Sequence, residues 1–234
     1  MQIEKYFIEN DGKINFSKQM GSNFAKRVAG DFNPIHDEDN KRFCVPGDLL
    51  FSVLLHKFGI NQKMQVSFSG MVGASTSLNF IENDDIIQVK DDNGKDYLTV
   101  ERSGDNTQSP QLINEIIEKY VTFSGQTFPH ILVPLMEDAG MMINPARPLV
   151  IYENMRLELD NLAITQPQLE VSQSTLSVDG KRGTATLAFN ILSGDKKVGC
   201  GSKQMVLSSL RAYDAKQIST LAQEYDTRKQ SYSQ

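Results

Sequence analysis

The segment Gly47 to Phe58, GDLLFSVLLHKF, constrains the fold of this chain more than any other. It is strongly apolar and contains no glycine or proline after its first residue, a pattern that fits a buried helix better than a strand. From Met64 onward the pattern changes to strand-like runs, which Gly, Asn and Asp turns separate. The sequence therefore predicts one buried helix followed by a group of strands.

A similar order follows in the second half of the chain. The polar run at residues 103–111, SGDNTQSPQ, is the best candidate for a linker, because nothing in it can pack and Pro110 interrupts a continuing ladder. We therefore expect two domains, at residues 1–104 and 105–234. The other elements expected from periodicity are a strand at 3–8, helices at 17–28, 112–123, 130–142 and 214–225, strands at 148–159, 168–178, 183–192 and 197–207, and a frayed tail after 225.

A direct comparison of the two halves favours an internal repeat. Residues 29–36, AGDFNPIH, align without gaps on residues 124–131, SGQTFPHI, and the alignment keeps the small residue, the glycine and the proline. The functional positions differ: Asp31 becomes Gln126, His36 becomes Ile131 and, after a gap, Gly47 becomes Leu135. If the repeat is real, the second copy has lost the chemistry of the first.

Charge and composition exclude several classes of protein. The net charge of -5 disfavours a nucleic-acid partner, because phosphate binding is driven by clustered Lys and Arg, and no such cluster occurs. No stretch is apolar enough to span a membrane, and the N-terminus has no signal-peptide core, so we expect a cytoplasmic protein. Cys44 and Cys200 lie far apart and belong to no metal-ligand pattern, so we expect both to be reduced and structural.

Asp31 and His36 are the strongest candidates for chemistry. They lie five residues apart in a loop that Asn33-Pro34 bends, so both side chains can point into one cleft and hold a water molecule there. A carboxylate and an imidazole can take a proton from water and return one elsewhere. The same residues also suit an ordinary loop, in which Asp and Asn bond the local backbone and Pro fixes the bend.

Gly47 begins the apolar segment, where the main-chain N–H groups of a helix lack intrahelical acceptors and the helix dipole is positive. Such a terminus suits a developing oxyanion, and glycine lets a thioester carbonyl approach the backbone closely. Asp48 follows directly and can either cap the helix dipole or oppose negative charge at this place.

The string Gly30 to His36, GDFNPIH, resembles the active-site signature of the MaoC-like (R)-specific enoyl-CoA hydratases. The acidic Glu38, the helix start Val45-Pro46-Gly47 and the later string from Val66 to Gly73 are similar to that family in the same order. The resemblance covers roughly residues 15 to 80. It implies an α+β double hot-dog fold, in which two antiparallel sheets each wrap around a central helix and form a pseudo-dimer.

The resemblance also implies roles for single residues. Asp31 and His36 would be the catalytic residues that activate water, and Gly47 and Asn33 would be the substrate-binding residues, Gly47 through its N–H and Asn33 by holding the loop. The implied enzyme is a lyase of fatty acid metabolism that needs no metal and no cofactor beyond the CoA or phosphopantetheine of its substrate. The implied partners are an acyl-thioester small molecule or an acyl carrier protein, with no nucleic acid and no membrane, and the chain would be a monomeric pseudo-dimer or a homodimer.

The loop between His36 and Gly47 departs from that family, because it is about half the usual length. Together with Asp48 and the altered second copy, the short loop keeps a second hypothesis open, that of a non-catalytic acyl-thioester-binding or regulatory protein. A third hypothesis is a hot-dog thioesterase, in which an acidic residue directs water at the carbonyl carbon.

Overall fold

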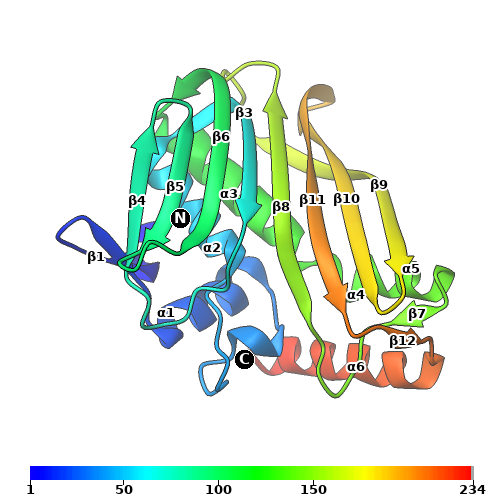
Figure 1. Ribbon diagram of the computed structural model, residues 1–234. Coiled ribbons are helices and arrows are strands. Elements are labelled where there is room, and N and C mark those ends of the chain that lie inside the picture. Colours follow the sequence, from blue (N-terminus) through cyan, green and yellow to red (C-terminus); the bar gives the residue numbers. More distant parts are fainter. Residues whose placement is uncertain (233–234) are drawn as a thin grey trace.

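The computed structural model describes residues 1–232 and, within them, one ten-stranded antiparallel sheet with its main helices on a single face (Figure 1). A two-stranded sheet of β12 (Arg211–Ala212) and β7 (Met141–Met142) lies beside it. The strands of the large sheet, in spatial order, are β1 (Ile8–Asn10), β2 (Lys13–Asn15), β4 (Leu78–Asn83), β5 (Ile86–Asp91), β6 (Asp96–Thr107), β3 (Ile60–Phe68), β8 (Val150–Leu159), β11 (Lys196–Ser208), β10 (Arg182–Ser193) and β9 (Pro167–Asp179).

The helices fall into two groups along the chain. Those of the first half are η1 (Ile3–Tyr6), α1 (Lys18–Asn23), the π-helix η2 (Phe24–Ala29), η3 (Pro34–His36) and α2 (Gly47–Phe58). Those of the second half are α3 (Pro110–Gly125), α4 (Thr127–His130), α5 (Leu132–Asp138) and α6 (Ala215–Tyr232). No helix in the described part of the chain is both long and apolar enough to cross a membrane.

The strand order is the same in both halves. In the first half the spatial order is β4-β5-β6-β3, and in the second half it is β9-β10-β11-β8, so in each half the earliest of the four strands pairs with the last. The halves meet where β3 pairs with β8 in antiparallel register, with Met64 opposite Leu157. This arrangement is a double hot-dog fold, as the sequence predicts.

A hairpin of two short strands, β1 and β2, breaks this symmetry. In the first half β2 pairs with β4 and covers its outer edge, with Ile14 opposite Leu78. In the second half β9 forms the edge of the sheet as far as residues 1–232 are concerned. The second unit therefore lacks the strand that closes the first.

Helix α2 is buried because it packs beside α3, and its side chains join those of α3 and of the sheet in one hydrophobic cluster. Its residues from Asp48 to Leu55 are all buried, which explains why the segment is apolar on every side. The rings of Phe51 on α2 and Tyr120 on α3 make an edge-on contact, with 5.2 Å between their centroids. The bounds of α2 are those predicted from the sequence.

Four local predictions are wrong. Residues 3–8 form η1 and the start of β1 instead of a strand, and the presumed linker contains the end of β6, where Thr107 pairs with Ile60, and the start of α3. The helix expected at 130–142 is divided into the end of α4, α5 and β7. The tail expected to fray after 225 continues α6 as far as Tyr232, because Tyr225 and Tyr232 pack on the loop that contains Phe32.

Candidate active site

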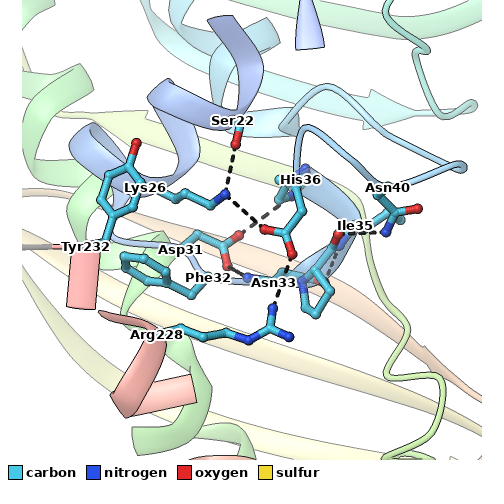
Figure 2. Close-up of polar contacts among 12 residues, drawn as sticks. Ser22, Lys26, Asp31, Phe32, Asn33, Ile35, His36, Asn40, Arg228 and Tyr232 are labelled. Atoms are coloured by element: carbon cyan, nitrogen blue, oxygen red, sulfur yellow. Dashed lines mark hydrogen bonds and ion pairs between the residues drawn. The ribbon is translucent and has the colours of Figure 1, made fainter. Parts of the chain in front are cut away.

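The loop that follows η2 owes its shape to glycine and asparagine. Gly30 has a φ of 67°, a left-handed conformation that suits glycine, and it ends the helix. The Asn33 side chain accepts a hydrogen bond from the Ile35 N–H at 3.2 Å, which caps η3, while Pro34 occupies the first position of η3. Figure 2 shows the resulting loop with Asp31 and His36 on one side.

Asp31 and His36 come together as the sequence predicts. His36 Nε2 lies 3.7 Å from Asp31 Oδ2, and the two side chains are partly exposed, at 12% and 28%. Each is fixed by the backbone: Asp31 Oδ1 accepts the Asn33 N–H at 2.9 Å, and His36 Nδ1 lies 2.7 Å from the Cys44 carbonyl oxygen. The pair is thus held in place on one side and open on the other.

A cavity of about 520 Å³ opens next to this pair. It extends from the loop at residues 30–36, called the motif loop below, past the start of α2 to strands β8 and β11 of the second half. Asp31, Asn33, His36 and Gly47 all line it, so the structure brings the four predicted site residues to one space. Apolar side chains from both halves make up much of the remaining wall, among them Leu50, Phe68, Val72, Leu132, Ile143 and Met205.

Gly47 is required for a reason that the sequence did not reveal. A Cβ atom at this position would lie 2.9 Å from the Tyr152 ring and 3.3 Å from the Phe68 ring. Those two aromatic rings therefore pack directly against the first turn of α2. Among residues 1–232 the Gly47 N–H has no hydrogen-bond acceptor, as is usual for the first residue of a helix.

Three buried polar residues at the same place were not predicted as a group. Asp48, Ser124 and Lys203 are 8%, 5% and 5% exposed, and all three line the cavity. Ser124 Oγ donates a hydrogen bond to Asp48 Oδ2 at 2.5 Å, and Lys203 Nζ donates to Ser124 Oγ. Asp48 belongs to the first half and Ser124 to the second, 76 positions later, so the pairing of the halves brings these two together.

Burial governs the titration of this cluster. Loss of solvent raises the pKa of Asp48, while Lys203 and the hydrogen bond from Ser124 act in the opposite direction. The pKa of the nearby Tyr120 hydroxyl is raised well above its usual value, first by burial and then by the Asp48 charge. Burial also raises the pKa of Cys44 to about 11, so this thiol stays protonated at neutral pH and is a poor nucleophile. Both cysteines are free.

The C-terminal helix α6 holds the motif loop from outside. The Tyr225 hydroxyl accepts the Phe32 N–H at 3.2 Å and shares its proton between the carbonyl oxygens of Gly30 and Gly125, each also at 3.2 Å. Arg228 Nη1 and Lys26 Nζ bind the two oxygens of Asp37, at 3.1 and 3.0 Å. Helix α6 therefore contacts the loop through both a buried hydroxyl and a surface ion pair.

Comparisons with solved structures find distant likenesses among hot-dog proteins. The peroxisomal multifunctional enzyme type 2 of Drosophila melanogaster is 10% identical, with a TM-score of 0.46; the match covers 86% of this chain and 48% of that enzyme. An acyl-CoA thioesterase II from Mycobacterium marinum is 8% identical, with a TM-score of 0.45 and coverage of 92% and 99%. A structure described as a MaoC-like dehydratase is 9% identical, with a TM-score of 0.43 and coverage of 87% and 98%.

The fold and the cavity define a double hot-dog protein with a cavity between its halves. The family described as "Protein of unknown function (DUF3581)" matches residues 1–216, and the chain belongs to this family. No curated protein matches the chain. The matched range ends at the start of α6, so Tyr225 and Arg228 lie beyond it.

Proposed function

We propose that this protein is a MaoC-like hydratase or dehydratase that acts on a 2-enoyl or 3-hydroxyacyl thioester of CoA or of an acyl carrier protein. One observation carries the proposal: Asp31 and His36 face each other across 3.7 Å at the wall of a cavity large enough for an acyl group. In this proposal residues 1–104 supply the acid–base pair, and residues 105–234 complete the cavity.

The hydrogen bond of His36 decides how the pair treats water. A carbonyl oxygen only accepts hydrogen bonds, so His36 Nδ1 must carry a proton where it contacts Cys44. In the neutral imidazole Nε2 is then an acceptor, as is the Asp31 carboxylate opposite it. Two acceptors 3.7 Å apart do not bond each other, but one water molecule can donate a proton to each.

Water held in this way is polarised toward hydroxide. Its oxygen bonds to C3 of the enoyl group while one of its protons passes to the Asp31–His36 pair. The electron pair of the C2–C3 double bond shifts to C1–C2, and the carbonyl electron pair moves onto the thioester oxygen until C2 is protonated and the carbonyl forms again. The Gly47 N–H at the positive end of α2 would stabilise that oxygen. A proton from the pair then reaches C2, and the reverse sequence is the dehydration. CoA or phosphopantetheine enters only as part of the substrate.

A purified sample assayed with crotonyl-CoA tests this proposal. We expect the unmodified protein to hydrate the double bond, and the Asp31→Asn and His36→Ala variants to lose that activity, since each lacks one of the two groups that can take a proton from water. Equal rates in all three proteins would reject the assignment. Release of free CoA would instead indicate a thioesterase, and binding without turnover would indicate a non-catalytic acyl-thioester-binding protein.

A further inference from the structure

The buried cluster of Asp48, Ser124 and Lys203 poses an electrostatic question at the proposed site. Asp48 is the second residue of α2 and follows directly the glycine whose N–H would meet the thioester oxygen. A bare carboxylate there would oppose a second negative charge, and in a buried site this repulsion is strong. The chain nevertheless places a carboxylate in this position and encloses it.

Lys203 provides a positive charge that can balance the negative charge of Asp48. It is a lysine on the inward face of a sheet strand, between the buried residues of β8 and β10, where a charged side chain is expected only with a partner. Its ammonium lies 4.2 Å from the centroid of the Tyr152 ring and donates to Ser124, which in turn donates to Asp48. The Tyr152 ring is also the one that packs on Gly47. The cation therefore lies one aromatic ring away from the start of α2.

We propose that Lys203 is a positioning residue of this site: acting through Ser124, it neutralises the Asp48 carboxylate and keeps the start of α2 favourable to an anionic oxygen. This inference rests on the proposed hydration, because that reaction is what places negative charge on the thioester oxygen. Within it, Ser124 has a specific part, since a hydroxyl can donate to the carboxylate and accept from the ammonium at the same time.

The surroundings of Asp48 make Lys203 the decisive neighbour. The charged and titratable groups that act on it or respond to it are Lys203, Asp31, His36 and Tyr120. Of the charged groups that lower the pKa of Asp48, Lys203 has a larger effect than His36, and Asp31 raises that pKa. Asp48 Oδ1 has no hydrogen-bond partner within residues 1–232. The negative charge of Asp48 is therefore balanced through Ser124 and Lys203.

Kinetics of a double-mutant cycle test the inference. At a pH above the raised pKa of Asp48 we expect Lys203→Met to lower kcat/KM for crotonyl-CoA about tenfold or more, because it unmasks the Asp48 charge. Asp48→Asn added to Lys203→Met should restore most of that loss, since the site is neutral again. Lys63→Met, which removes an exposed lysine from β3, is the matched control and should leave kcat/KM unchanged. Additive losses in the double variant would reject the charge-balancing role and leave only a packing role.

Thermal unfolding measured against pH provides a readout that needs no turnover. Without Lys203 the folded-state pKa of Asp48 rises further above the value in the unfolded chain, so the folded protein binds the extra proton. Stability of Lys203→Met should therefore fall as pH rises from the ordinary aspartate range through the raised pKa, more steeply than in the unmodified protein. Adding Asp48→Asn should remove this difference.

The two readouts separate the possible failures. An unmodified protein that hydrates no thioester rejects the proposed function, and the melting temperatures then decide by themselves whether Lys203 neutralises Asp48. A Lys203→Met variant whose melting temperature follows pH as the unmodified protein does would overturn the inference, whatever the activity. If Lys203→Met does not fold at neutral pH but the double variant Lys203→Met with Asp48→Asn does, the charge pairing is supported. If neither variant folds, the result counts against the charge pairing.

Discussion

Two helix ends of this chain, the junctions at Ala29-Gly30 and at Ser124-Gly125, meet in the folded protein, yet only the first leads to the acid–base pair of the cavity. The Tyr225 hydroxyl lies 3.2 Å from the carbonyl oxygens of both Gly30 and Gly125. These are the two glycines that the aligned strings AGDFNPIH and SGQTFPHI place in register. The matching order of strands in the two halves supports the same correspondence.

The two junctions differ in the side chains that they contribute to the cavity. The first junction continues into Asp31 and His36, which line the cavity, whereas the second continues into the exposed Gln126. The second junction contributes Ser124 instead, which links Asp48 of the first half to Lys203 of the second. The second copy therefore has no acid–base pair but still supplies polar groups to the shared site.

The largest expected effect separates the acid–base residues from their counterparts. We expect Asp31→Asn and His36→Ala to lower kcat/KM for crotonyl-CoA by about 10²- to 10⁴-fold, the usual contribution of a general acid or base. Gln126→Ala and Ile131→Ala, at the matched positions of the second copy, should keep it within about twofold, as is usual for substitutions remote from the chemistry. Comparable losses at Gln126 or Ile131 would contradict the asymmetry.

The two junction glycines should differ in their tolerance of a side chain. A Cβ at Gly125 would lie 1.9 Å from the Ala29 carbonyl oxygen, so Gly125→Ala forces two backbones apart and should cost about 3 kcal/mol of stability or more. At Gly30 a Cβ meets nothing within 4 Å, and only the left-handed φ of 67° opposes alanine, at about 1 kcal/mol.

Denaturant unfolding of Gly125→Ala and Gly30→Ala measures this contrast. The expected result is a clearly lower midpoint for the Gly125 variant and a small decrease for the Gly30 variant. If the two midpoints decrease equally, then the close contact between η2 and α3 is not what makes Gly125 necessary.

A smaller effect is expected where α6 joins the two junctions. Tyr225→Phe keeps the ring but removes the hydroxyl, which leaves the buried Phe32 N–H without its partner and should cost about 2 kcal/mol. Because that N–H lies next to Asp31, kcat should decrease moderately as well. Tyr232→Phe is the control, since its hydroxyl makes solvent-exposed hydrogen bonds with the Asn23 and Arg27 side chains. If Tyr225→Phe has the same melting temperature as the control, then the Tyr225 hydroxyl does not stabilise the motif loop.

The sequence predicted two local features of the site correctly but none of the contacts between distant residues. Helix α2 and the motif loop could be predicted because an apolar run and an Asn-Pro bend act within a few residues. The neighbours of Asp48 could not, since Ser124 and Lys203 are close to it only after the sheet has formed. Lys203 gave no signal of its own, because one lysine in a polar-looking stretch of strand normally faces solvent.

Packing explains the errors at the ends of elements. Residues 103–107 are polar and look like a linker, but pairing with β3 turns them into the end of β6. The polar tail after 225 remains helical because Tyr225 and Tyr232 contact Phe32, with centroid distances of 6.0 and 5.8 Å. In both places tertiary contacts outweigh the weak local preference.

The destination of a water oxygen tests the central claim most directly. Crotonyl-CoA is incubated with the protein in ¹⁸O-labelled water, and the products are analysed by mass spectrometry. Water held between Asp31 and His36 and directed at the double bond predicts one labelled oxygen in the 3-hydroxyl group of an intact thioester. Label in a free carboxylate, or no label in any product, would contradict it.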